Sequence, residues 1–288
     1  MAKINIIKSS GERVPLDTGK IIKTLEKAGA DFNLAEKIAQ DIYKKSWQGI
    51  TTKEIYKMAM RALRGNPAIA ARYSLRDAIF RLGPAGFEFE KYIMLLLRTY
   101  GYKAVLPEIL KGACITHEVD ILAEKDNKKM MIECKLRQGT EIFINIKDAL
   151  STWARFLDLA DGAKIGTCPK VDQPWIVTNS RFSYDALNYG LCKGMVMLSW
   201  NTPKEKPLPA WIDEKKLYPI TVLHSVNKFQ LFAFSKAEIL LLEDIVKFSP
   251  SDLAKATKLS KKQLEPILAE AREVLDFEPQ INIMKHTT

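Results

Sequence analysis

The sequence is poor in the two residue types that build disulfide frameworks and zinc clusters. Its 288 residues include four cysteines and three histidines. No two cysteines form a Cys-x-x-Cys pair, and the four do not cluster along the chain. These features argue against a disulfide-stapled fold and a zinc cluster, and they favour a reducing compartment. The four are Cys114, Cys134, Cys168 and Cys192.

Long hydrophobic runs are also absent. The first ten residues lack the apolar core of a signal peptide. The longest apolar runs, such as residues 92–97, are far too short to cross a bilayer. We therefore expect a cytoplasmic protein that does not enter a membrane.

Positive charge is concentrated near the N-terminus. The formal net charge of the chain is +10. Residues 1–85 hold 16 lysines and arginines against 8 aspartates and glutamates, so this segment carries most of the excess. Such a concentration favours polyanionic partners, namely nucleotides or nucleic acid. A basic surface that is simply solvated stays open as the alternative.

The length predicts two or three domains, and the first extends over residues 1–84. Helical periodicity and capping residues predict a mainly helical domain that begins with a small hairpin. The Gly83-Pro84 pair is a strong breaker and marks its end. The expected elements are strands near 3–7 and 13–15, a helix capped by Asp17, and helices near 34–45, 52–64 and 67–82.

Strands alternate with helices in residues 85–202, which predicts an α/β layer with a mixed sheet flanked by helices. The polar turn at 125–129 joins two of the strands into a hairpin. The expected helices are 87–100, 146–160 and 184–191, and the expected strands are 102–106, 117–124, 130–136, 175–178 and 195–200.

The third region, residues 203–288, is expected to be helical after an opening linker. Residues 201–216 hold three prolines and several charges, and they have the composition of a linker or surface loop. Helices are expected at 236–247, 250–257 and 261–275. The fold class is therefore α/β in the centre and α+β overall.

The most informative segment combines Asp120 with Glu133 and Lys135 of the next strand. Side chains alternate along a strand, so Glu133 and Lys135 project to one face. Folding the hairpin about Asn127 places Asp120 beside residues 133 and 134. Two charges on an apolar strand are costly unless they pair or bind a metal. A purely structural ion pair between Glu133 and Lys135 is the alternative.

Two carboxylates and an ammonium group suit phosphodiester hydrolysis. Carboxylate oxygens can hold Mg²⁺ or Mn²⁺, which activates a bound water and neutralises charge on the phosphate. The lysine can orient the attacking water and stabilise the same charge. The metal ligands expected from this reasoning are Asp120 and Glu133.

Glu90 is a candidate third carboxylate of the same site. Positions 87, 90, 94 and 97 fall on one face of the expected helix 87–100, and the other three are Phe87, Met94 and Leu97. A carboxylate in an apolar stripe is expensive without a partner. A role as a metal ligand would explain its presence.

The central residues resemble Mrr-like restriction endonucleases of the PD-(D/E)xK superfamily. Gly-Phe-Glu-Phe-Glu-Lys-Tyr-Ile at 86–93, continued by Leu96-Leu97 and Gly101-Tyr102, is similar to the opening helix of that family, with Glu90 at the position of its glutamate. Residues 175–179, with Phe182 and Ala186, resemble a later strand and helix.

The catalytic motif of that family is also represented. Asp120-Ile121 is similar to its strand start, and Ile132-Glu133-Cys134-Lys135 to its catalytic strand. The chain departs from the family at Glu118-Val119, where Gly-Gly is usual. The resemblance implies a metal-dependent DNA endonuclease in which Asp120, Glu133 and Lys135 are catalytic.

The N-terminal hairpin has features of a phosphate-binding site. Residues 5–21 combine a strand, a polar turn with Lys8, and a helix start with Lys20. Backbone N–H groups at turns and helix N-termini, together with two lysines, can bind phosphate. A basic hairpin without a ligand is the alternative.

This segment resembles the ATP cone, the regulatory module of ribonucleotide reductases and of their gene repressor. The resemblance runs through residues 7–11, 14–17 and 20–21 and resumes at 49–52 and 71–73. It implies that ATP or dATP is a regulatory ligand. The positions that match nucleotide-contacting residues of the family are Lys8, Ser9, Val14, Asp17, Lys20, Ile21 and Thr52.

The C-terminal helices carry a group of lysines at a short turn. This turn is loosely similar to helix-hairpin-helix DNA-binding modules, although their glycine is missing from residues 257–260. A packing or dimerisation role is equally compatible with the sequence. The lysines are Lys255, Lys258, Lys261 and Lys262.

The combined prediction is a Mg²⁺-dependent DNA endonuclease whose access to DNA is set by the nucleotide in the cone. The alternative is a non-catalytic, nucleotide-sensing regulator that only binds DNA. The expected partners are DNA and an adenine nucleotide, and a homo-oligomer stays open.

Overall fold

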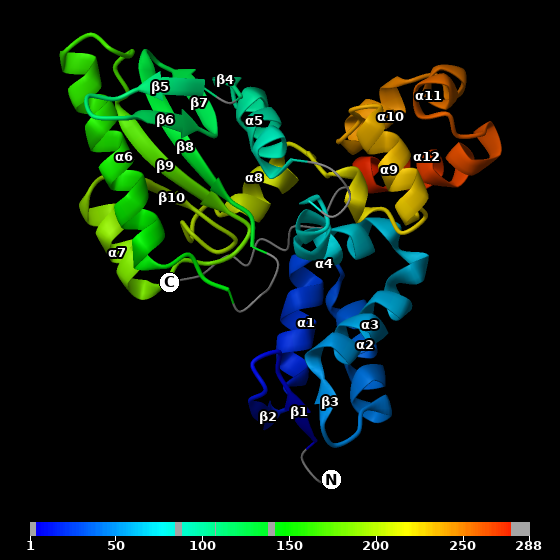
Figure 1. Cartoon of the computed structure of the whole chain (residues 1–288). Helices are drawn as coiled ribbons and strands as arrows, with labels where there is room; N and C mark the ends of the chain where they lie inside the picture. The colour runs from blue at the N-terminus through cyan, green and yellow to red at the C-terminus, as the bar shows by residue number, and fades with distance from the viewer. Residues whose placement is uncertain (1–3, 84–87, 107, 138–141, 278–288) are drawn as a thin grey trace, which may run out of the picture. The chain divides into compact units, whose positions relative to one another are not determined.

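The computed structural model describes residues 4–83, 88–106, 108–137 and 142–277. The chain forms two compact units: the first joins residues 1–78 to residues 220–288, and the second comprises residues 79–219. Both combine helices with short strands, so the expected α+β fold class is confirmed (Figure 1). No helix among the described residues is long and apolar enough to cross a membrane.

The first unit opens with a three-stranded sheet of order β2-β1-β3, in which β1 is antiparallel to β2 and parallel to β3. Helices α1 to α3 pack beside this sheet, and α4 follows them. The strands are β1 (Asn5–Ile7), β2 (Arg13–Pro15) and β3 (Ile50–Thr51). The helices are α1 (Thr18–Lys27), α2 (Phe32–Lys45), α3 (Thr52–Ala62), the 3-10 turn η1 (Leu63–Gly65) and α4 (Pro67–Phe80).

Polar residues cap α1, α2 and α3. Asp17 accepts a hydrogen bond of 3.2 Å from the backbone N–H of Lys20, and Asp31 accepts one of 2.8 Å from that of Leu34. Thr51 and Glu54 form a reciprocal capping box at the start of α3. These side chains satisfy N–H groups that have no partner inside the helix, so the helices begin within two residues of their expected starts.

An apolar core holds this part of the unit together. Leu25, Ala35, Ile50 and Ala59 are fully buried and belong to one cluster of side chains. Phe277, which follows the last helix of the chain, packs against the same cluster. Phe277 therefore joins the end of α12 to the core of the N-terminal residues.

The C-terminal helices differ from the sequence prediction in one place. The helix expected at 236–247 is interrupted: α9 ends at Lys236, Glu238 has a φ of 58°, and α10 begins only at Leu242. The two later helices are confirmed. The elements are the 3-10 turn η3 (Ile220–Val222), α9 (Lys228–Lys236), α10 (Leu242–Lys247), α11 (Pro250–Thr257) and α12 (Lys261–Asp276).

The second unit contains a five-stranded mixed sheet of order β10-β9-β8-β7-β4 and a separate pair, β5-β6. Strands β8, β9 and β10 are parallel, whereas β7 is antiparallel to both of its neighbours. The strands are β4 (Lys103–Val105), β5 (Glu108–Lys111), β6 (Thr116–Val119), β7 (Ile121–Lys125), β8 (Lys128–Lys135), β9 (Gln173–Thr178) and β10 (Val196–Leu198).

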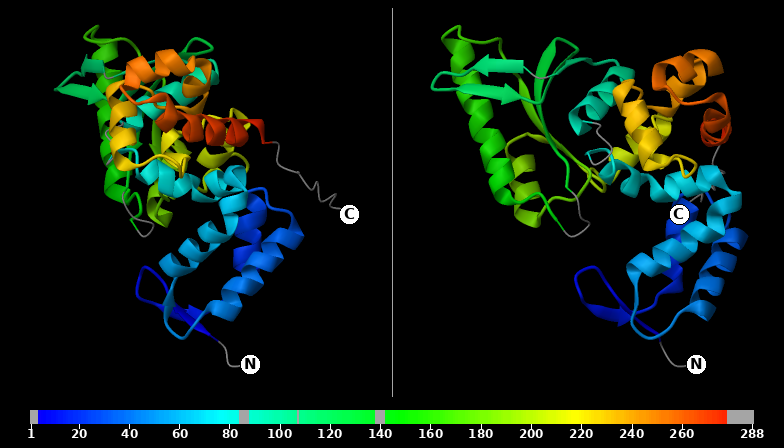
Figure 2. Two further views of the ribbon diagram at one scale, coloured as in Figure 1. Left: turned by 90° about the vertical axis from the view of Figure 1, so that its right-hand side faces the viewer. Right: turned by 45° about the vertical axis from the view of Figure 1, so that its right-hand side comes forward.

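Helices cover this sheet on both sides. Figures 1 and 2 show α6 and α7 along one face and α5 and α8 on the other. The hairpin expected at residues 125–129 is confirmed, and its turn residues Asp126 and Asn127 have φ values of 53° and 60°. The helices are α5 (Phe89–Thr99), α6 (Ile146–Lys164), α7 (Tyr184–Cys192) and α8 (Leu208–Glu214).

Two expectations for the second unit are wrong. Residues 201–216 contain helix α8 rather than only a linker, because Leu208 and Ile212 are fully buried on one side of it. The single strand expected at 117–124 is broken at Asp120 into β6 and β7, which pair with different partners. This break positions the candidate site.

Candidate functional site

Asp120 lies in the one-residue break between β6 and β7. Its Oδ2 accepts a hydrogen bond of 2.8 Å from the backbone N–H of Cys134 in β8. Burial raises the pKa of the Asp120 carboxyl, and the nearby Glu133 and Glu90 raise it further, against the lowering effect of the Cys134 N–H and of Lys135. The hairpin therefore brings Asp120 beside residues 133 and 134, as the sequence predicts.

Glu133 is the most deeply buried carboxylate of this group, with 5% of its surface exposed. Lys135 Nζ donates a hydrogen bond to its Oε1, and Nη1 of Arg155 in α6 donates one to its Oε2. Charge buried in this way is costly unless it is balanced. Here Lys135 and Arg155 both neutralise the charge of Glu133. Glu133 and Lys135 thus form the ion pair that the sequence offered as an alternative, and Arg155 is a second cation of the site.

Arg155 is the residue that sequence reasoning missed. Besides its bond to Glu133, its guanidinium donates to the backbone carbonyl of Glu118, two residues before Asp120. It therefore ties β6, just before the strand break, to the C-terminal end of β8. An arginine in the middle of a helix carries no signal of its own, and only the packing of α6 beside the sheet reveals the contact.

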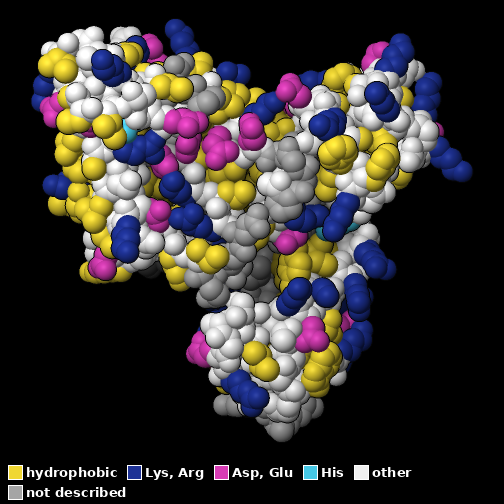
Figure 3. Space-filling view, in the orientation of Figure 1, with side chains coloured by type: hydrophobic (Ala, Val, Ile, Leu, Met, Phe, Trp, Pro, Cys, Tyr) yellow, Lys and Arg dark blue, Asp and Glu magenta, His cyan; other side chains and the backbone are white. Residues whose placement is uncertain are grey.

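Glu90 lies in the first turn of α5, at the edge of the buried face of that helix. Phe89, Met94 and Leu97 are buried, while Phe87 lies outside the described residues. Since Glu90 contributes to the raised pKa of Asp120, the two carboxylates are within electrostatic reach. Figure 3 shows acidic side chains gathered on the surface beside α5, with lysine and arginine side chains below them.

A metal site of three protein side chains is not preformed in the described part of the chain, which holds no group of three or more His, Cys, Asp or Glu suited to one. Mg²⁺ needs fewer, because it keeps several of its waters and uses one or two carboxylates. Asp120 fits this role, since no described residue donates a hydrogen bond to its Oδ1. Glu133 can also bind the metal ion only if Lys135 or Arg155 turns away from it.

The candidate nucleotide site lies where two parallel strands end. Strand register pairs Ile7 with Thr51, so Lys8 and Thr52 follow at the same edge of the small sheet. Thr52 opens α3, whose N-terminal N–H groups favour an anion. Lys8 Nζ forms an ion pair of 2.7 Å with Glu12, and both side chains remain accessible. The structure thus brings a lysine to a helix N-terminus.

The other predicted contact residues occupy different environments. Lys20 is 83% exposed and lies 3.9 Å from Asp17, measured from Nζ to Oδ2, at the start of α1. Val14 is partly buried opposite Ile6, whereas Ser9 is exposed in the turn. Ile21 is buried in the core cluster with 8% exposure, so only its edge is accessible to a ligand.

An aromatic pair adjoins these residues and was not predicted. Tyr56 lies one helical turn beyond Thr52 on α3, and its ring stacks on that of Tyr73 with centroids 5.6 Å apart. Burial raises the pKa of Tyr73 to about 12. Their spacing in the sequence, 17 positions, gives no sign of the contact because it depends on how α4 packs on α3.

This fold defines an α+β protein whose first unit opens with a small mixed sheet and helices. A family model described as the ATP cone domain matches residues 4–79, so the ATP-cone resemblance is confirmed. A second model, described as AF1548-like, C-terminal, matches residues 218–275. An uncharacterized protein of Archaeoglobus fulgidus is 33% identical over 180 residues, which are 62% of this chain and 98% of the relative. The chain belongs to the AF1548-like family.

A solved structure extends this relationship. The "Crystal Structure of Protein of Unknown Function AF1548" matches with a TM-score of 0.55 and 31% sequence identity. The match covers 69% of this chain and 98% of that one. The names of these relatives assign no activity.

Proposed function

We propose that this protein is a metal-dependent DNA endonuclease whose activity is regulated by ATP or dATP in its cone. One observation carries the proposal: Asp120, Glu133 and Lys135 converge where β6, β7 and β8 meet, with Glu90 in electrostatic reach. A sheet of this kind with helices on both faces is also the setting that the resemblance to Mrr-like nucleases implies.

The chain's own residues would divide the work as follows. Asp120 and Glu133 would hold Mg²⁺ or Mn²⁺, which lowers the pKa of a bound water and neutralises charge on the phosphate. Lys135, whose side chain is 28% exposed, can donate a hydrogen bond to the attacking water or to the phosphate. Arg155 would keep the strand break and Glu133 in register.

Nucleotide control follows from the ATP cone. A bound triphosphate would place its charge at the edge shared by Lys8 and the start of α3. If nucleotide changes the affinity for DNA, DNA must change the affinity for nucleotide by the same factor. Phe277, the C-cap residue of α12, packs on the core of the cone, and through this contact nucleotide binding can act on the C-terminal helices.

The turn between α11 and α12 is a candidate DNA contact. Lys258 has a φ of 59°, a left-handed conformation that favours glycine, so the chain keeps a lysine where a less costly residue would fit. Lys261 and Lys262 follow in the first turn of α12 and are exposed. Figure 3 shows basic side chains spread over this part of the first unit. Such lysines would bind phosphate without reading sequence.

A second candidate function is a nucleotide-sensing DNA-binding regulator without cleavage. The observation that favours it is that both carboxylate oxygens of Glu133 accept hydrogen bonds from cationic side chains, which neutralise its charge. A carboxylate held in this way serves stability as well as catalysis. The two candidates differ in whether Asp120 and Lys135 are needed for chemistry.

The test is DNA cleavage by the purified full-length chain. Supercoiled and linear plasmid would be incubated with Mg²⁺ or EDTA, with and without ATP. Asp120→Ala and Lys135→Ala should abolish cleavage and keep DNA binding, while Lys128→Ala, an exposed lysine at the other end of β8, serves as the matched control. If the protein binds DNA but does not cleave it with any divalent metal ion, it is the DNA-binding regulator and not an endonuclease. Wild-type cleavage by Asp120→Ala would show that the catalytic site lies elsewhere.

A further inference from the structure

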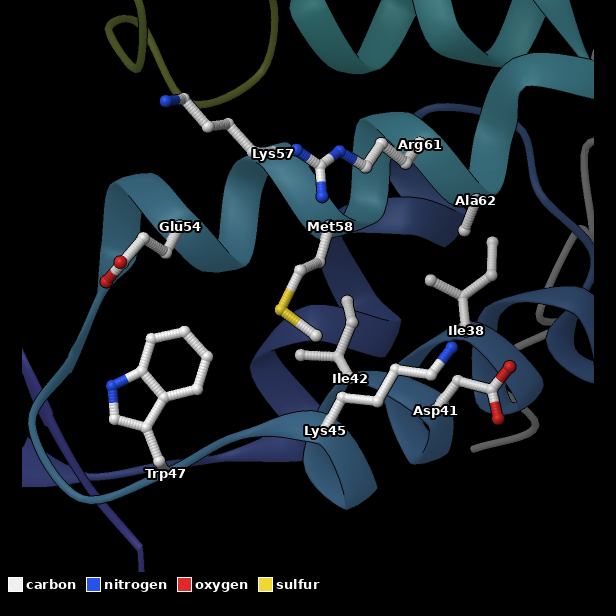
Figure 4. A pocket seen from close by; sticks show the side chains of 10 residues that line it. All are labelled: Ile38, Asp41, Ile42, Lys45, Trp47, Glu54, Lys57, Met58, Arg61 and Ala62. Atoms are coloured by element: carbon white, nitrogen blue, oxygen red, sulfur yellow. The ribbon is translucent and has the colours of Figure 1, made fainter.

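A pocket of about 690 Å³ opens between α2 and α3 of the cone. Met58 of α3 and Ile42 of α2 face each other across it, and Trp47, from the loop after α2, closes one end, while the Lys57 side chain extends away from α2 (Figure 4). Pockets of roughly 300–1,000 Å³ hold small-molecule ligands in proteins. This pocket is therefore large enough for a ligand of nucleotide size.

The floor of the pocket is apolar and its end is aromatic. Ile42 of α2 is buried, and the thioether of Met58 on α3 points toward it (Figure 4). The Trp47 side chain is 53% exposed, although burial of an indole is strongly favourable. An exposed indole beside an apolar floor is suited to stacking against a flat ring.

The rim of the pocket is cationic. Lys45, Lys57 and Arg61 line it, and none of the three forms an ion pair with any residue that the structure describes. Lys57 and Arg61 are four residues apart on α3, a spacing at which like charges destabilise a helix. An anion placed between them would remove that repulsion.

The two carboxylates that line the pocket, Glu54 and Asp41, offset two of these three positive charges. Glu54 accepts hydrogen bonds of 2.8 Å from both the N–H and the hydroxyl of Thr51, and these bonds lower its pKa and hold it to the helix start. The positive charge of Lys57 also lowers the pKa of Glu54, so this carboxylate stays ionised beside the pocket. The pocket therefore has a cationic excess beside an aromatic ring.

This pocket is separate from the predicted ATP site. About 3.6 residues complete a helical turn, so Glu54, Met58 and Arg61 lie on a different side of α3 from Thr52 and Tyr56. None of the residues predicted to contact ATP lines the pocket.

We propose that the pocket binds a nucleobase joined to a phosphate, with the base stacked on Trp47 and the phosphate held by Lys45, Lys57 and Arg61. Stacking is tolerant of base identity because every base has a flat π-face. The same chemistry is offered by a free mononucleotide and by an unpaired nucleotide of a single strand, so the two are distinguished by experiment. The proposal does not depend on nuclease activity.

The experiment uses the full-length protein in EDTA, with a fluorescein-labelled oligothymidylate and, separately, thymidine monophosphate as probes. Trp47→Ala should weaken binding about tenfold, the scale of one base stacked on an aromatic side chain, and Trp47→Phe should largely restore it. Lys57→Gln with Arg61→Gln should weaken binding and lower the salt dependence by about 0.7 per lost phosphate contact.

Two controls make the result specific. Lys44→Gln, an exposed lysine of α2 outside the pocket, should leave binding unchanged, and a tenfold excess of ATP would occupy the predicted ATP site during each titration. Circular dichroism would establish that each variant is folded. Trp47-dependent binding of the monophosphate identifies a mononucleotide site, and Trp47-dependent binding of the oligonucleotide alone identifies a single-strand contact. Equal affinity of folded Trp47→Ala and wild type for both probes would overturn the proposal.

Discussion

The backbone N–H of Cys134 donates a hydrogen bond of 2.8 Å to Oδ2 of Asp120. This bond holds the carboxylate at a strand break, where burial and two neighbouring carboxylates raise its pKa. The fold therefore places a carboxyl group where its charged form is disfavoured. A group held at such a cost is more readily explained by function than by stability.

The first prediction concerns Asp120→Asn. A raised pKa means that protonated Asp120 stabilises the fold below the usual carboxyl range, and that this contribution is lost as the pH rises through the raised value. At neutral pH the neutral asparagine should therefore raise the thermal midpoint while abolishing cleavage. Its amide oxygen can still accept from Cys134. Melting curves at neutral and acidic pH would measure the effect, which should shrink as the pH falls.

The contacts of Asp120 could be predicted from the sequence because they are local. Asp120 and Cys134 are 14 positions apart and belong to one hairpin, whose turn residues and alternating strands set the register. Arg155 could not be placed in the same way. It is 22 positions beyond Glu133, and its contact depends on how a long helix packs on the sheet.

Helices without a regular amphipathic pattern were also hard to predict from the sequence. Helix α9 exposes Phe229 and Phe232, at 68% and 56%, while burying Gln230, so its apolar residues have no helical period. In α8 the prolines and charges suggest a linker, yet Leu208 and Ile212 are one turn apart and fully buried. Tertiary packing determines both helices, and their local sequence does not show it.

The second prediction compares two glutamates at the start of α5. Glu90→Gln should reduce cleavage about tenfold or more, because it removes negative charge that favours a cation beside Asp120. Glu88→Gln is the matched control, since Glu88 is exposed and its side chain makes no capping bond. Cleavage rates at several Mg²⁺ concentrations would separate weaker metal binding from slower chemistry. If both variants lose the same fraction of the cleavage rate, the loss comes from a disturbed start of α5 and not from the metal site.

The third prediction tests Arg155 as a positioning residue. Arg155→Lys keeps the positive charge but cannot bond Glu133 and the Glu118 carbonyl together, because lysine lacks the planar fork. We expect the Mg²⁺ dependence of cleavage to shift, since Glu133 becomes freer to bind metal. Arg155→Ala should also destabilise the fold by about 3 kcal/mol, because it leaves a buried carboxylate with one cation. Urea unfolding and metal titration give the two readouts.

The fourth prediction concerns nucleotide binding. Lys8→Ala together with Lys20→Ala should weaken ATP binding roughly a hundredfold, because each charge-assisted phosphate contact is worth about 1–3 kcal/mol. Lys27→Ala, an exposed lysine in the last turn of α1, should have little effect. Calorimetry would measure the affinity for ATP with and without DNA, and the affinity for DNA with and without ATP. Equal ATP affinity in the two cases would leave a nucleotide site that does not act on DNA binding.

The fifth prediction concerns Asp158 on α6 and the loop after β5. Its carboxylate accepts hydrogen bonds of 2.8 and 3.3 Å from the N–H groups of Cys114 and Ile115, and one of its oxygens lies 2.8 Å from His117 Nε2. Led by the Cys114 N–H, these bonds lower the pKa of Asp158 from 3.8 to about 2. A Cβ added at Gly112 would lie 2.0 Å from the same carboxylate, so the loop is closely fitted to it.

Because the folded pKa of Asp158 is depressed, its contribution to stability is complete above 3.8 and is lost as the pH falls toward about 2. Asp158→Asn should therefore unfold at lower urea than wild type at neutral pH, and the difference should narrow below pH 3.8. Asp161→Asn, which alters an exposed ion pair with Lys164 on the same helix, is the matched control. Gly112→Ala should destabilise the fold by about 1–3 kcal/mol through overpacking at every pH. A constant difference between Asp158→Asn and wild type across this range would mean that the carboxylate charge does not hold the loop.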